Sequence, residues 1–113
     1  MKQAMDPVDL TNLRSMTDAD RGMEKALFEE FFISFEAGIN TLQTNIGESA
    51  SEAWRKEAHA LKGIALNLGA EQLGALCKQA QEELHASAGD KDELLKKIRA
   101  EYEQVRQFLL TLM

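Results

Sequence analysis

The sequence has one proline, Pro7, one cysteine, Cys77, and no long apolar run. Because proline breaks helices, no later residue interrupts a helical pattern in this way. A single cysteine excludes a disulfide bond within the chain. The apolar runs are much shorter than the roughly 18 residues of a membrane-spanning helix, and residues 1–5 lack the apolar stretch of a secretory signal. We therefore expect a cytoplasmic protein that does not enter a membrane.

Positive charge is also scarce, because the sequence has 13 lysines and arginines but 19 acidic residues, which gives a net charge of -6. Nucleic acid is therefore not expected as a partner, since binding to phosphates needs a basic face. His59, His85 and Cys77 are too few and too far apart in sequence for a metal site. There is no glycine-rich phosphate loop, no Ser-His-Asp arrangement and no pair of catalytic carboxylates. We expect no metal, no other cofactor and no autonomous enzyme.

The apolar residues recur every three or four positions, which predicts helices rather than strands. With 113 residues, of which 44% are hydrophobic, the chain has room for one core, so we expect a single domain over residues 1–113. Short turns make helices that follow one another in sequence run in opposite directions. The sequence therefore predicts an all-α fold, an antiparallel up-and-down four-helix bundle over about residues 18–112 with a short additional N-terminal helix at about 7–16.

The ends of the four long helices are predicted from capping residues and glycines. The expected N-terminal caps are Asp18 for the first, the capping box Ser49-Ala50-Ser51-Glu52 for the second, and Asp90 with Glu93 for the fourth. The glycines expected to end helices are Gly47, Gly69 and Gly89. The stripes expected to form the core are Leu27, Phe28, Phe31, Phe35, Ile39, Leu42 and Ile46; Trp54, Ala58, Leu61, Ala65 and Leu68; Leu73, Leu76, Cys77, Ala80 and Leu84; and Leu95, Ile98, Tyr102, Val105, Leu109 and Leu112.

His59 lies on the second long helix, outside its apolar stripe. Consecutive residues of an α-helix are about 100° apart, which places His59 about 140°, Gly63 about 180° and Lys62 about 80° from the centre of the stripe. His59 is therefore expected on the solvent side. The glycine one turn later leaves room beside the imidazole, at a cost in helix stability, and the lysine gives it a cationic neighbour.

A neutral imidazole can act as a nucleophile near pH 7. A lysine beside it favours a negatively charged substituent on the ring, such as a phosphoryl group. Since the chain has no means of binding a nucleotide, it could accept such a group and pass it on. A surface histidine without function stays open as the alternative from these residues alone.

The run His59-Ala60-Leu61-Lys62-Gly63, followed by Leu68-Gly69-Ala70, resembles the signature of the histidine-containing phosphotransfer (Hpt) domain family, His-x-x-Lys-Gly with a Leu-Gly-Ala type ending. The resemblance extends over the whole chain, because Hpt domains of this size are antiparallel four-helix bundles with the histidine on the second long helix. One departure is Ile64, where many members have a small or hydroxyl residue. It lies about 80° from the core centre on the side opposite Lys62, so it can pack between helices.

The resemblance implies a role for each residue of the site. His59 would carry the phosphoryl group, Lys62 would neutralise its charge and Gly63 would allow the partner to approach closely. Several members also have a glutamine on the next helix that hydrogen-bonds the imidazole, and Gln81 fits this description. The residues expected to contact the partner are Arg55, Lys56 and Leu66.

The function implied is that of a monomeric phosphorelay intermediate in two-component signalling. Its partners would be a histidine kinase, including hybrid kinases, and the receiver domains of response regulators, whose aspartates give and take the phosphoryl group. Three alternatives stay open: a phosphoacceptor domain of a larger histidine kinase, a receiver-binding module that carries no phosphate, and an unrelated bundle used for dimerisation. The presence of both His59 and Lys62 argues against a pure binding module, which needs neither.

Overall fold

The computed structural model describes residues 6–113. Residues 1–5, on which the prediction of no secretory signal rests, lie outside the described part. Over residues 6–113 the chain forms helices and no strand, which confirms the all-α class. The helices are α1 (Thr11–Thr17), α2 (Arg21–Thr44), the 3₁₀ turn η1 (Glu48–Ala50), α3 (Ser51–Leu68), α4 (Glu71–Glu82) and α5 (Ala88–Leu110). In this part of the chain, no helix combines the length and the apolar character that crossing a membrane requires.

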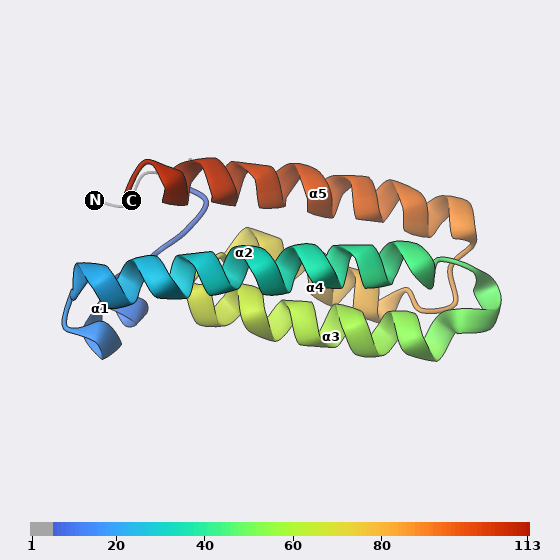
Figure 1. Cartoon of the computed structure of the whole chain (residues 1–113). Helices are drawn as coiled ribbons and strands as arrows, with labels where there is room; N and C mark the ends of the chain where they lie inside the picture. The colour runs from blue at the N-terminus through green and yellow to red at the C-terminus, as the bar shows by residue number, and fades with distance from the viewer. Residues whose placement is uncertain (1–5) are drawn as a thin grey trace.

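Helices α2 to α5 lie side by side along the long dimension of the molecule (Figure 1). α2 contacts α3 and α5, and α4 contacts the same two helices, so the four enclose one core. α1 packs against α2 at the end of the molecule where α5 finishes. An ion pair between Arg14 on α1 and Glu24 on α2, with 3.0 Å between nitrogen and oxygen, holds α1 in this place.

The apolar stripes predicted for the core are buried, apart from residues at their ends and edges. In the α3 stripe, Trp54, Ala58, Leu61 and Ala65 are inaccessible to solvent and Leu68 is nearly so. The predicted core residues that are exposed or only partly buried are Leu27, Ile46, Leu76, Leu84 and Leu112. Helical periodicity therefore identified the inner face of each long helix.

The predicted N-terminal cap of α2 was wrong by two residues. Asp18 has a left-handed backbone, with φ of 52°, and ends α1 instead. Asp20 has the extended backbone that a cap requires, and its carboxylate accepts a hydrogen bond of 2.9 Å from the Met23 N–H. Two acidic residues this close in sequence are both candidates for a cap, and the backbone conformation decides between them.

The capping box predicted for α3 was also wrong. Ser49 lies inside η1, where its backbone is already helical, so it cannot act as a cap. α3 begins at Ser51, and no side chain caps it. Gly47 precedes η1 and does not end α2, which stops at Thr44.

Gly89 does not stop the chain, because it lies in the first turn of α5. The cap of α5 is Ser87, whose hydroxyl accepts a hydrogen bond from the Asp90 N–H at 3.1 Å, so the prediction of Asp90 with Glu93 was wrong. Ser87 has the extended backbone of a cap residue.

Gly69 ends α3 in the left-handed conformation that the sequence predicted, with φ of 100°. A second constraint acts at this position, because a Cβ on Gly69 would lie 2.0 Å from the Asp9 carbonyl oxygen. The Asp9 N–H donates a hydrogen bond of 2.9 Å to the Gly69 carbonyl. The segment before α1 is therefore fastened to the turn between α3 and α4.

Trp54 connects α3 to the last turn of α4. Its indole N–H donates a buried hydrogen bond of 2.7 Å to the carbonyl oxygen of Ala80. Because α4 ends at Glu82, this carbonyl is one of those that helix geometry leaves without a partner at a C-terminus. On α5, Lys91 is fully buried, with its ammonium 5.2 Å from the centre of the Trp54 ring. Trp54 thus joins three helices at this end of the bundle.

We predict that Trp54→Phe lowers the free energy of unfolding by about 1–3 kcal/mol, because the buried Ala80 carbonyl loses its donor. Urea unfolding followed by far-UV circular dichroism measures the change, since Trp54 is the only tryptophan and its fluorescence disappears with it. An unfolding midpoint equal to that of the wild type would contradict this role of the indole.

Cys77 is buried in the core, and burial raises the pKa of its thiol to about 12 by disfavouring the charged thiolate. At pH 8 the thiol is therefore protonated as well as inaccessible, and we predict that thiol-specific reagents label it only after the bundle unfolds. The check is mass spectrometry of iodoacetamide-treated protein with and without urea. Rapid, complete labelling of the native protein would show that Cys77 is accessible to reagents in the folded bundle, and would contradict this prediction.

Candidate functional site

His59 lies on α3 with an exposed side chain, and its ring contacts the last turn of α4. The Nδ1 atom is 3.2 Å from the Oε1 atom of Gln81. An amide oxygen only accepts hydrogen bonds, so this contact is a hydrogen bond in the tautomer with the ring proton on Nδ1. The Nε2 atom of the neutral ring then carries a lone pair. The arrangement suits an exposed imidazole whose Nε2 atom is free to act as a nucleophile.

Two contacts define how α3 and α4 pass each other. His59 meets Gln81, and Leu66 meets Gly74, where a Cβ would lie 2.5 Å from the leucine Cδ2. Leu66 is seven residues after His59, whereas Gly74 is seven residues before Gln81, so the two helices are antiparallel and in register over two turns. We refer to this line of contact as the α3–α4 seam.

Gly74 was not among the predicted site residues. Without a side chain, it allows α4 to approach α3 closely enough for Leu66 to cover it. The signal in the sequence was a glycine inside a helical stripe, which marks either a weak helix or a close approach. The position of Leu66 on α3 shows that Gly74 marks a close approach of two helices.

Lys62 and Gly63 lie one turn beyond His59 on α3, and both are partly buried. Lys62 forms no ion pair with any of the described residues, so its charge is available at the site. A Cβ added at Gly63 would meet no atom within 4 Å, so the space next to the imidazole is open. Leu66, which is 48% exposed, places an apolar side chain on the same side of α3 as His59. The structure therefore brings His59, Lys62, Gly63, Leu66 and Gln81 together.

The two other residues predicted to contact a partner differ in placement. Arg55, one turn before His59, forms an ion pair with Glu52, and this hydrogen bond raises the pKa of the arginine. Lys56 is exposed but lies about 60° farther round the helix than His59, on the side away from α4. Arg55 is therefore already paired, and Lys56 borders the site rather than belonging to the seam.

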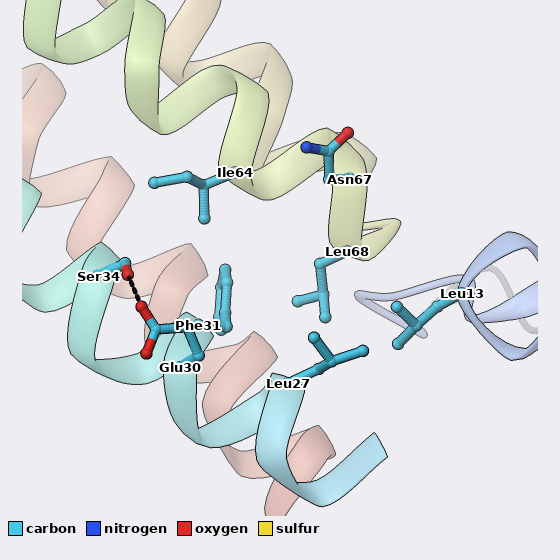
Figure 2. A pocket seen from close by; sticks show the side chains of 8 residues that line it. All are labelled: Leu13, Leu27, Glu30, Phe31, Ser34, Ile64, Asn67 and Leu68. Atoms are coloured by element: carbon cyan, nitrogen blue, oxygen red, sulfur yellow. Dashed lines mark hydrogen bonds between the residues drawn. The ribbon is translucent and has the colours of Figure 1, made fainter. Parts of the chain in front are cut away.

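A hollow of about 210 Å³ lies elsewhere, between α1, α2 and α3 (Figure 2). Ile64 and Leu68 line it from α3, and Phe31 lines it from α2. Ile64 is about 140° from His59 around α3, so the hollow opens on another face. Ile64 is partly buried and packs against the core at the boundary between α2 and α3.

Over residues 6–113, no group of three or more His, Cys, Asp or Glu side chains is placed to hold a metal ion. At the site itself, the imidazole is the group with nucleophilic chemistry, and the amide of Gln81 and the ammonium of Lys62 lie beside it.

Comparison with known families gives one match, in which the model of the Hpt domain fits residues 26–108. Comparison with curated proteins and with solved structures gave no match. The matched residues make up most of the chain and include all five that the structure brings together around His59. The chain belongs to the Hpt domain family.

Proposed function

We propose that this chain is a phosphorelay intermediate that carries a phosphoryl group on the Nε2 atom of His59. Hpt domains serve in histidine phosphotransfer in two-component signalling, as phosphocarrier modules rather than enzymes. The observation that supports the proposal most is the contact between His59 and Gln81, because it favours the proton on Nδ1 and so favours Nε2 as the nucleophile.

In the proposed transfer, the Nε2 lone pair attacks the phosphorus of an aspartyl phosphate. An N–P bond forms while the bond between phosphorus and the aspartate oxygen breaks, and the aspartate leaves as a carboxylate. The Nδ1 proton stays in place and keeps its hydrogen bond to Gln81, which stabilises the positive charge that the ring acquires. Lys62 offsets the negative charge of the phosphoryl group. The reverse reaction delivers the group to the next aspartate.

The proposed partners are receiver domains of response regulators and a histidine kinase, including a hybrid kinase. The exposed Leu66 offers an apolar contact beside His59, and Lys62 and Lys56 offer positive charge to an acidic receiver pocket; Arg55 would add to it by exchanging its ion pair with Glu52 for one with the receiver. We propose that the protein acts in the cytoplasm as a monomer, as a single domain with its four long helices in an antiparallel, up-and-down arrangement.

We predict that a phosphorylated receiver domain labels the wild-type protein but not His59→Gln. His85→Gln is the matched control, since it removes the other histidine, which is also exposed. Radiolabel on the small protein, stable in alkali and lost in acid, identifies phosphohistidine. Label on His59→Gln would place the phosphoryl group elsewhere. Binding of a receiver without any label on the wild type would favour a binding module that carries no phosphate.

We predict opposite effects of Gly63→Ala on stability and on transfer. The methyl group meets no atom of the folded chain and alanine favours a helix, so the free energy of unfolding should rise by about 0.5–1 kcal/mol. Transfer from a receiver should slow by about tenfold, equivalent to about 1.4 kcal/mol, because the methyl group occupies the space through which the partner approaches.

Urea unfolding and rapid-quench transfer assays on the same preparation measure the two effects of Gly63→Ala. A more stable variant with an unchanged transfer rate would show that the open space at Gly63 is not used by the partner.

A further inference from the structure

We propose that Lys78 on α4 is a second cation of the phosphoryl site, which neutralises the group on His59 from across the α3–α4 seam. The inference rests on the proposed function of His59 and extends it to a residue on the other helix.

The register of the seam determines the position of Lys78. The contacts of His59 with Gln81 and of Leu66 with Gly74 are two turns apart on both helices. Lys62 is three residues after His59, and Lys78 is three residues before Gln81. The two lysines therefore lie at the same level of the seam, between the two observed contacts.

Helical geometry also gives the depth of each residue in the seam. His59 lies about 60° farther from the core than Lys62, and Lys78 lies about 60° farther from the core than Gln81. Burial agrees with this, since His59 and Lys78 are exposed whereas Lys62 and Gln81 are partly buried. His59 and Lys78 thus occupy equivalent outer positions on the two sides of the seam, one turn apart along it.

The charges near the site leave Lys78 available. No ion pair involves Lys78 among the described residues, although Glu82 lies one turn along the same helix. Arg55, the other cation one turn from His59, is paired with Glu52. A phosphoryl group carries close to two negative charges. Lys62 from the inner side and Lys78 from the outer side supply two matching positive charges.

The test uses phosphoramidate as the phosphoryl donor, so that docking of a protein partner plays no part. The Nε2 atom of His59 forms the N–P bond, the P–N bond of the donor breaks, and ammonia leaves. The rate of phosphohistidine formation is followed by ³¹P NMR at several salt concentrations. The proteins compared are the wild type, Lys78→Gln, Lys78→Arg and the matched control Lys97→Gln, which removes an exposed lysine of α5.

We predict that Lys78→Gln forms phosphohistidine about three- to tenfold more slowly than the wild type at low salt, with a weaker dependence on salt. Lys78→Arg keeps most of the wild-type rate, because the charge is retained, and Lys97→Gln matches the wild type. All four proteins should show the same thermal unfolding midpoint, since Lys78 and Lys97 are exposed.

Two results would overturn the role of Lys78 alone: phosphorylation of Lys78→Gln at the wild-type rate, or equal slowing in Lys97→Gln, which would reveal a general effect of net charge. Absence of phosphorylation at His59 in the wild-type protein would instead overturn the proposed function, and the role of Lys78 with it. His59→Gln identifies the site of any label in the same series.

Discussion

The close packing of α4 against α3 is the constraint on which the site depends. Gly74 lets Leu66 lie directly against the α4 backbone at one end of the seam. At the other end, the indole of Trp54 holds the carbonyl of Ala80, the residue just before Gln81. Gln81 directly follows this second fixed point, which places its amide beside the imidazole of His59. The contact between His59 and Gln81 is thus a consequence of how the two helices pack.

Helix α3 has a buried face that packs in the core and an exposed face that carries His59. Its inner stripe is fully buried, and on the α2 side the packing is tight enough that a Cβ on Gly38 would lie 2.3 Å from the Leu61 side chain. Gly63, by contrast, faces open space. The two glycines have the same local cost to helix stability. Packing against Leu61 explains Gly38, whereas for Gly63 we propose that the open space serves the approach of a partner.

The sequence predicted the features that depend on periodicity. The stripes of α2, α3 and α5 and the exposed position of His59 follow from a repeat of 3.6 residues, and the left-handed Gly69 follows from the preference for glycine at the end of a helix. The resemblance to Hpt domains singles out Gln81, and its side chain contacts His59. Roles in phosphotransfer, as distinct from positions, stay predictions.

The features that failed depend on backbone conformation or on a second helix. Asp18 and Ser49 are good cap residues by type, but a left-handed or helical backbone prevents them from capping. Glycine often ends a helix, which predicts a helix end at Gly89, yet Gly89 lies in the first turn of α5. The close approach at Gly74 and the position of Lys78 beside the site follow only from the register of the α3–α4 seam. The sequence pattern of a single helix does not contain this register.

The most direct test of this account is the site of the N–P bond within the imidazole ring. Protein labelled with ¹⁵N-histidine is phosphorylated, and the long-range ¹H–¹⁵N and ³¹P couplings of the two histidine rings are measured. The account predicts phosphorus on Nε2 of His59, with the proton on Nδ1 before and after transfer. Phosphorus on Nδ1 of His59, or on either nitrogen of His85, would contradict it, because the contact with Gln81 would not then select the nucleophile.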